Sequence, residues 1–561
     1  MEGASASKCP NMSRRLLNVT AACAVVAGLA ITGTPAGAAP EPDGATYSET
    51  WFPSGDGTLL HAGVLLPRGQ EHKRHPVIVS VGPYFGSGTQ TSTWSATSSG
   101  PSARFQDLEE QGKIFKRGYA FVMVDSRGYG GSESCNDFGG KGEQLDAKSA
   151  VEWAAKQPWS TGKVGMWGKS YDAWTEVMAL AGKPKGLAAV VIQSPLLELY
   201  RALFDNGVHF DAGWYTMAEG YAQYDLTPPS TSSPESIVHA AKGTATNPDC
   251  YAMNQAMTPL PDHSLAYWQE RDLVARASTS TVPVMWSHGF NDINTKPINI
   301  FDLYSKLRGP KRAWFGQWDH VRGNQSDVVG RSGFMDEAMA WFDHYLRGKP
   351  LPSMPKQEVQ DGDGVWRTEA SYPPADGVLR AMPVRAGSYV DAPDNDSRMP
   401  SGGTWSVTQP APHDVRIAGL PRLTVTVQPT SPAGGNLVAL LYDVATDGTS
   451  RLVTRGAHLV SSGEALTFQL WPTDWLLPRG HRLALQLSAD DPFIYQPTYT
   501  GGRMTVKGGT LRLPMLTYLR TSNLVGHGAE AMNSVPSPTL VASVTKGHDV
   551  KADFGPAMRR R

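Results

Sequence analysis

Short apolar runs alternate with helix-like segments along the first 350 residues. We expect buried β-strands at 76–81, 120–124, 164–167, 188–192, 282–287 and 313–316. Residues 102–117 and 142–157 are expected to be helical, and in the second segment small apolar residues recur every three or four positions. An antiparallel hairpin over 46–66 precedes the alternation. Strands that alternate with helices predict an α/β domain with a parallel sheet and right-handed crossovers.

The pattern changes twice along the chain. Residues 199–280 separate two expected sheet strands without a regular period, which indicates a helical cap insertion. From about residue 356, short alternating strands such as 422–427, 437–443 and 482–487 are separated by Gly, Pro and Asp turns, which predicts a β-sandwich of the jelly-roll type. We therefore expect a catalytic domain over 46–198 and 281–350, the cap over 199–280, and the sandwich over 356–555.

The segment Trp167-Gly168-Lys169-Ser170-Tyr171-Asp172 places a serine between an expected strand and an expected helix. A serine on a sharp strand-to-helix turn is exposed at the helix N-terminus, where it can serve as a nucleophile. Gly168 fits the small residue required two positions before the serine. Asp172 stands where the pattern G-x-S-x-G has its last glycine, so the motif alone also fits an ordinary turn with a solvent-facing serine.

An acid and a histidine follow the last two expected strands of the sheet. Asp292 lies after 282–287 and His320 after 313–316, which gives the chain order Ser, Asp, His of an α/β-hydrolase. His320 is expected to be the general base and Asp292 the residue that orients it. His288 and Asp319 are the competing candidates, because each lies close in sequence to one of these positions.

The oxyanion hole is expected to combine one backbone and one side-chain donor. The N–H group of Tyr171 follows the nucleophile, and Tyr84 lies in the loop after an early strand, where such hydrolases place the second donor. Tyr84 could equally be an aromatic residue that covers this loop.

Composition and charge limit the classes of function. The chain has 561 residues, enough for two to four domains, and a net charge of -1, so no basic surface indicates nucleic acid as a partner. No cysteine and histidine cluster has metal-ligand spacing, and neither a metal nor another cofactor is expected. Nothing in the sequence specifies an oligomeric state.

The N-terminus resembles an export signal. Arg14 and Arg15 precede the apolar run 19–31 and the small residues 35–39, so we expect a signal peptide over 1–38. The signal could use the general or the twin-arginine export route. We expect a secreted protein without a membrane span, because the apolar run is too short to cross a bilayer. After its removal two cysteines remain, Cys135 and Cys250. They form a disulfide candidate in an oxidising compartment, the alternative being two separately buried thiols.

Five motifs in the same order carry a family resemblance. They are Pro83-Tyr84, the loop from Asp125 to Ser132, Gly168-Lys169-Ser170-Tyr171, Gly289-Phe290-Asn291-Asp292 and Gly316-Gln317-Trp318-Asp319-His320. Together they resemble the X-prolyl dipeptidyl-peptidase and cocaine-esterase (CocE/NonD) serine hydrolases over nearly the whole chain. The resemblance implies an α/β-hydrolase with a cap and a jelly roll, a triad of Ser170, Asp292 and His320, and Tyr84 in the oxyanion hole.

The resemblance leaves the substrate open between X-Pro peptides and acyl esters or amides. We expect dipeptidyl-peptidase activity, for which Asp172 is a candidate anion for the substrate's free amine; the alternative is a helix-dipole role in the first helical turn. Trp167 and Trp318 are further candidates for substrate contact. A hypothesis of another class is a carbohydrate- or cell-wall-binding protein with an inactive hydrolase core.

Overall fold

The computed structural model describes residues 43–85, 101–210, 221, 235, 238–239, 241–242, 248–393, 402–461, 463, 465–491, 494–495, 497–521, 524–527 and 547–560. The expected signal peptide lies outside these residues. None of the helices described here combines the length and the apolar content that a bilayer crossing requires.

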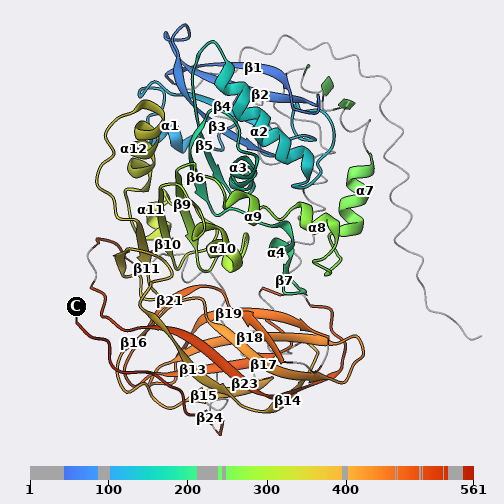
Figure 1. The fold of residues 1–561 in the computed structure, drawn as a ribbon, viewed down its shortest axis with the longest axis vertical. Helices are drawn as coiled ribbons and strands as arrows, with labels where there is room; N and C mark the ends of the chain where they lie inside the picture. The colour runs from blue at the N-terminus through green and yellow to red at the C-terminus, as the bar shows by residue number, and fades with distance from the viewer. Residues whose placement is uncertain are drawn as a thin grey trace, which may run out of the picture. The chain divides into compact units, whose positions relative to one another are not determined.

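A ten-stranded sheet forms the core of the first domain (Figure 1), in the order β1-β2-β4-β3-β5-β6-β9-β10-β11-β12. The strands from β4 to β11 are parallel, whereas β1, β2 and β12 are antiparallel to their neighbours. The bounds are β1 Ala45–Pro53, β2 Leu59–Pro67, β3 His75–Gly82, β4 Ala120–Asp125, β5 Ser160–Lys169, β6 Leu187–Gln193, β9 Val284–Gly289, β10 Lys311–Gly316, β11 Gln357–Gln360 and β12 Trp366–Glu369. The expected α/β-hydrolase architecture is confirmed.

Helices cover both faces of this sheet, as Figure 1 shows. Along β5 the side chains alternate, so that Met166 packs with the helices of one face and Trp167 with those of the other. The first face is covered by α2 (Lys141–Lys156), α3 (Tyr171–Gly182), α9 (Val274–Ala277) and α10 (Ile300–Tyr304), and the second by α1 (Asp107–Glu110), α11 (Ser326–Val329) and α12 (Phe334–Arg347). The short turn η1 (Pro297–Asn299) precedes α10, and its Ile298 packs in a separate cluster with residues of the second domain. The segment 102–117, expected to be one helix, contains only the single turn α1.

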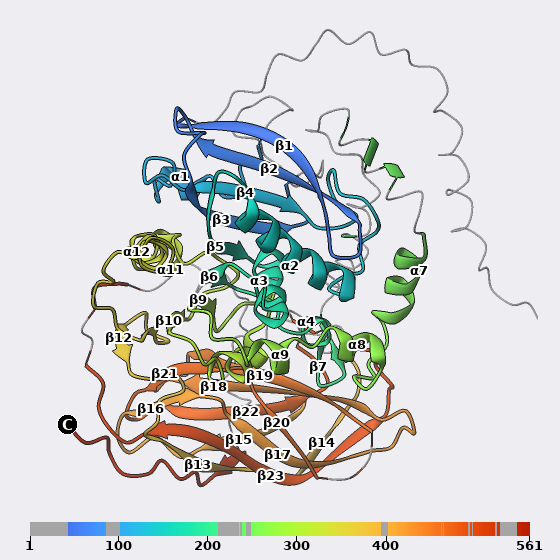
Figure 2. The same ribbon diagram turned by 45° about the horizontal axis from the view of Figure 1, so that its top comes forward.

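The second domain is a β-sandwich, shown from two directions in Figures 1 and 2. One sheet has the order β20-β17-β23-β16-β21, with β13 and β14 also paired to β23, and the other has the order β19-β18-β22-β15-β24. Inward-facing residues such as Leu423, Leu437 and Leu485 form its core. The bounds are β13 Gly377–Val384, β14 Gly387–Val390, β15 Thr404–Thr408, β16 Val415–Gly419, β17 Arg422–Pro429, β18 Gly435–Val444, β19 Ser450–Val460, β20 Ala465–Gln469, β21 Thr473–Leu477, β22 Arg482–Ser488, β23 Arg503–Leu516 and β24 Asp549–Val550.

Strands β11 and β12 lie within the range that we expected to belong to the sandwich, yet they extend the hydrolase sheet. Trp366 of β12 explains this placement, because its ring stacks on Trp318 at 5.5 Å and contacts Trp314 at 5.3 Å. Burial of such large aromatic surfaces favours pairing with the first domain. The polypeptide therefore completes the catalytic sheet before it enters the sandwich.

The described part of the insertion contains α4 (Leu199–Leu203), a hairpin of β7 (Phe204–Asp205) and β8 (Val208–His209), α7 (Pro248–Met257) and α8 (Ala266–Glu270). The hairpin lies within the insertion that we expected to be helical. Its Asp205 carboxylate accepts hydrogen bonds from the Tyr495 hydroxyl (2.7 Å) and the Ala457 N–H group (2.9 Å) of the sandwich. A disulfide joins Cys135 to Cys250 of α7, with 6.1 Å between the Cα atoms, and ties the insertion to the loop after β4.

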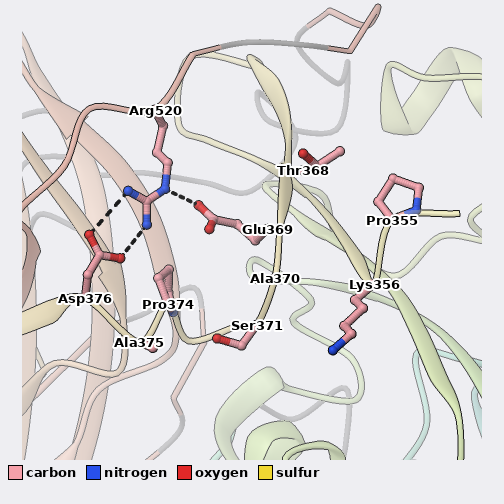
Figure 3. Close-up of a pocket in the computed structure, with 10 residues that line it drawn as sticks. All are labelled: Pro355, Lys356, Thr368, Glu369, Ala370, Ser371, Pro374, Ala375, Asp376 and Arg520. Carbon is pink, nitrogen blue, oxygen red and sulfur yellow. Dashed lines mark hydrogen bonds and ion pairs between the residues drawn. The ribbon is translucent and has the colours of Figure 1, made fainter. Parts of the chain in front are cut away.

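A pocket of about 660 Å³ lies beside the segment that leads from β12 into the sandwich (Figure 3). Arg520 crosses one side of it, donating to Glu369 (2.8 Å) and pairing with Asp376. Lys356 comes from the opposite side. The pocket is remote in sequence from the expected catalytic residues, and none of them lines it.

Candidate active site

Ser170 lies on a strained turn between β5 and α3. Its backbone has φ of 69° and ψ of -124°, a conformation that residues with a side chain rarely adopt. Strand β5 ends at Lys169 and the helix begins at Tyr171, so the serine is the single residue between the two elements. This is the geometry of a nucleophile elbow, which keeps the hydroxyl clear of the backbone.

Gly168 allows the strand and the helix to approach each other. A Cβ atom at this position would lie 2.5 Å from the carbonyl carbon and oxygen of Asp172 and 2.7 Å from the backbone nitrogen of Ala173. Because these are backbone atoms, they cannot move aside as a side chain could. The missing last glycine of the motif does not prevent the turn, since Asp172 and Ala173 are both accommodated within α3.

Asp292 and His320 meet at the carboxyl ends of the neighbouring strands β9 and β10. The Nδ1 atom of His320 lies 2.9 Å from the Oδ2 atom of Asp292. The fully buried carboxylate also accepts hydrogen bonds from the N–H groups of Asn294 and Thr295 and from the Thr295 hydroxyl, each at 2.9 Å. Burial alone would raise the pKa of Asp292, but His320 and these donors hold it well below its usual range.

His320 is suited to accept a proton. Burial lowers its pKa from the ordinary value of a histidine, and the Asp292 carboxylate only partly opposes this effect. The imidazole is therefore neutral at pH 7, and because Nδ1 is held by the carboxylate, Nε2 is the ring nitrogen that can accept a proton. Burial also lowers the pKa of the nearby Lys169 to about 8.

The two competing residues have other environments. The Nε2 atom of His288 lies 3.5 Å from the same oxygen of Asp292, but this side chain is fully buried, and burial lowers its pKa to about 4. The second competitor, Asp319, accepts a hydrogen bond through Oδ1 from the backbone N–H group of Ile293 at 3.0 Å. The geometry thus favours His320 over His288 and Asp292 over Asp319.

Tyr84 and Tyr171, the expected oxyanion donors, lie close together, with 6.5 Å between their ring centres. Burial raises the pKa of Tyr84 to about 12, while Arg104 and hydrogen bonds that include one with Ser170 act in the opposite direction. The Tyr84 hydroxyl is therefore neutral and within reach of the serine. The side chain of Tyr171 donates to Glu143 at 2.7 Å, whereas its N–H group belongs to the first turn of α3, where helical donors lack partners within the helix.

Arg104 was not predicted from the sequence. Its Cζ atom lies 3.6 Å from the centre of the Tyr84 ring, and its guanidinium pairs with Asp172 and donates to the carbonyl oxygen of Lys169 at 3.0 Å. Asp172 is fully buried, and burial raises its pKa to about 6 despite the arginine. A carboxylate engaged in this way by an internal cation is poorly placed to bind a substrate amine.

The structure places Trp167 and Trp318 in the apolar core on the α12 face of the sheet, and neither side chain is exposed. Trp167 packs against Phe342 of α12, and Trp318 stacks on Trp366. In a parallel sheet covered on both faces, large side chains fill the layers between sheet and helices. These two tryptophans therefore support the loops that bear the site rather than contact a substrate.

The sandwich contacts the loops that carry the acid and the histidine. Gln317 donates through Nε2 to the carbonyl oxygen of Asp474 of β21 at 3.0 Å, and its Oε1 atom accepts from Asn291 at 3.2 Å. Asn291 precedes Asp292, and Gln317 lies three residues before His320. One glutamine thus connects both loops to the second domain.

Comparison with known sequences accounts for both domains. Residues 56–322 match the X-Pro dipeptidyl-peptidase (S15 family) catalytic domain, and residues 352–535 match the X-Pro dipeptidyl-peptidase C-terminal non-catalytic domain. The chain belongs to the X-Pro dipeptidyl-peptidase (S15) family. It is accordingly a serine hydrolase, and the expectation of an enzyme is confirmed.

Individual relatives of this S15-family chain are distant. The "Putative Xaa-Pro dipeptidyl-peptidase" of Streptomyces avermitilis is 25% identical, with 87% of each chain covered. The Xaa-Pro dipeptidyl-peptidase of Lacticaseibacillus rhamnosus is 23% identical, with 64% of this chain and 50% of the relative covered.

Two solved structures show the same fold. An alpha-amino acid ester hydrolase has a TM-score of 0.68 at 19% identity, covering 87% of this chain and 99% of the other. A CocE/NonD family hydrolase from Staphylococcus aureus has a TM-score of 0.64 at 16% identity, covering 83% and 93%. At these identities the likeness concerns the fold alone.

Proposed function

We propose that Ser170, His320 and Asp292 form a catalytic triad that acts through an acyl-enzyme. The observation that carries this proposal is the 2.9 Å contact between Nδ1 of His320 and Asp292, at the sheet edge where Ser170 occupies its strained turn. His320 takes the Ser170 proton as the hydroxyl oxygen attacks the substrate carbonyl, and then gives it to the leaving group. Water, activated by the same imidazole, releases the acyl group.

The tetrahedral intermediate needs donors for its oxyanion. In our proposal these are the Tyr84 hydroxyl and the Tyr171 N–H group. Both residues are buried, and hydrogen bonds to a developing charge are strongest in a site shielded from water. Loss of one such donor costs about 3–4 kcal/mol of transition-state stabilisation in comparable sites.

The substrate that we propose is a peptide with proline in the second position, from which the enzyme releases an X-Pro dipeptide. Membership of the S15 family supports this choice, as do the names of the sequence relatives. Such an enzyme must recognise the free amine of the first residue.

Ester hydrolysis is the second candidate, and one observation favours it. Asp172, which we expected to bind the substrate amine, is buried and paired with Arg104. If no other anion takes its place, the same triad acts on acyl esters, for which an amine anchor is not required.

A side-by-side rate measurement distinguishes the two candidates. Purified protein is assayed with Gly-Pro and Ala-Pro nitroanilides, with their N-acetylated forms, and with p-nitrophenyl acetate and butyrate. Preferred turnover of the free-amine X-Pro amides supports the dipeptidyl-peptidase, whereas turnover of esters alone contradicts it. Ser170→Ala should abolish every activity.

We also propose that the protein is secreted after cleavage behind Ala38. The pattern of 1–38 supports this, and the disulfide between Cys135 and Cys250 suits an oxidising compartment. N-terminal sequencing of protein from the culture medium should begin at Ala39. Recovery of the uncleaved chain from the cytoplasm alone would contradict the proposal.

A further inference from the structure

A tyrosine from the cap lies against the oxyanion hole. The hydroxyl of Tyr221 is hydrogen-bonded to the hydroxyl of Tyr84, 137 residues earlier in the chain. Both side chains are buried, with 6% and 5% of their surface exposed. No pattern in the sequence predicts this contact, because the two residues belong to different structural units.

Neighbouring rings fix the position of Tyr221. Its ring centre lies 5.0 Å from that of Tyr171, 6.0 Å from that of Phe138 and 6.2 Å from that of Tyr84. All three distances lie within the range over which aromatic rings attract one another. Tyr221 therefore contacts both residues that the proposed function uses as oxyanion donors.

A hydroxyl group can donate one hydrogen bond while it accepts others. We propose that Tyr221 is a positioning residue of the oxyanion hole, which donates its hydroxyl proton to the Tyr84 oxygen and so leaves the Tyr84 proton directed at the oxyanion. This inference rests on the proposed function, in which Tyr84 is an oxyanion donor. No proton is transferred between the two tyrosines, and both stay neutral throughout the reaction.

Two features strengthen the Tyr84 hydroxyl as a donor. A hydrogen bond accepted by its oxygen polarises the O–H group, because chains of hydrogen bonds reinforce one another in a buried site. The Arg104 guanidinium lies over the same ring, with its Cζ atom 3.6 Å from the ring centre, and its positive charge makes the Tyr84 hydroxyl a stronger donor. Tyr221 of the insertion and Arg104 of the loop before α1 thus act on the same catalytic side chain.

Tyr221 belongs to the insertion, so the oxyanion hole draws one of its supports from outside the sheet. A substitution that breaks the hydrogen bond between Tyr221 and Tyr84 should lower kcat, and its effect should not be limited to substrate affinity.

The first test compares two tyrosines of the insertion. Tyr221→Phe removes the hydroxyl and keeps the ring, and we expect kcat to fall about tenfold while KM changes less than twofold. Tyr200→Phe is the matched control, because its hydroxyl donates to the carbonyl oxygen of Pro261 at 2.8 Å, and it should retain wild-type rates. Titration of active sites with a fluorophosphonate expresses each rate per competent enzyme, so that partial misfolding does not affect the result.

The second test is a double-mutant cycle. Tyr84→Phe should reduce kcat by about 10²–10³-fold. If Tyr221 acts through Tyr84, the double variant should be less than twofold slower than Tyr84→Phe alone. A further tenfold loss in the double variant, or wild-type kcat in Tyr221→Phe, would overturn the inference.

The outcomes also separate this inference from the function on which it rests. If Tyr84→Phe keeps full activity, the oxyanion role of Tyr84 fails, and the inference fails with it. If Tyr84→Phe is slow and Tyr221→Phe is not, only the inference fails. An X-Pro boronate, which forms a tetrahedral adduct with a catalytic serine, should bind about tenfold more weakly to Tyr221→Phe; unchanged affinity would contradict the positioning role.

Discussion

Gly168→Ala tests the elbow with a single methyl group. The added Cβ atom would lie 2.5 Å from the carbonyl carbon of Asp172, about 1 Å inside the usual contact distance between carbon atoms. Only a shift of β5 relative to α3 can relieve this contact, and Ser170 lies between the two elements. Overpacking of this kind costs about 1–3 kcal/mol of folding free energy. A displacement of about 1 Å at the nucleophile costs about 100-fold in rate.

The assay measures kcat/KM with the preferred substrate and the free energy of unfolding in urea. Gly182→Ala, at the other end of the same helix, is the matched control, since its Cβ atom would meet only the side chain of Lys148, at 3.5 Å or more. The control should keep its activity and gain up to about 1 kcal/mol of stability. Activity of Gly168→Ala above half of the wild-type value would refute the elbow geometry.

Three further predictions follow from the site and its supports. The kcat/KM value should rise with pH as His320 loses its proton, with a midpoint below 6.5, because burial lowers the pKa of this base; a midpoint above 7 would contradict the assignment. Replacing Cys135 and Cys250 together by serine should lower the free energy of unfolding in urea by about 2–5 kcal/mol, since the disulfide closes a loop of 115 residues; equal stability would show that the crosslink is dispensable. Gln317→Ala should reduce kcat about tenfold, since the loops that carry Asp292 and His320 lose their link to Asp474. Asn436→Ala, deep in the sandwich, is the control: it should lower the free energy of unfolding, while kcat per titrated active site stays at the wild-type value.

The predictable part of the site is the part that local sequence determines. Ser170, Asp292 and His320 each follow a short apolar run, and the parallel pairing of such strands brings their carboxyl ends to one edge of the sheet. The glycine before the nucleophile is equally local. This is why Ser170, Asp292 and His320 could be selected as candidates before any contact was known.

The remaining part depends on contacts between distant segments. Arg104 and Tyr221 reach Tyr84 from a loop and from the cap, and neither lies in a motif. Strands β11 and β12 have the short alternating pattern of the sandwich, but their aromatic contacts place them in the first sheet. Trp167 and Trp318 were associated with the site through their sequence neighbours, whereas alternation along β5 and packing against Trp366 direct them into the core.

The central claim is that Ser170 is the nucleophile and His320 its base. The most direct measurement is intact-mass and peptide mapping of the protein after reaction with a fluorophosphonate at pH 7.5. We expect one adduct per chain, located on Ser170, which is absent in Ser170→Ala and forms at least 100-fold more slowly in His320→Ala. An adduct on another residue, or rapid labelling of Ser170 without His320, would contradict the account.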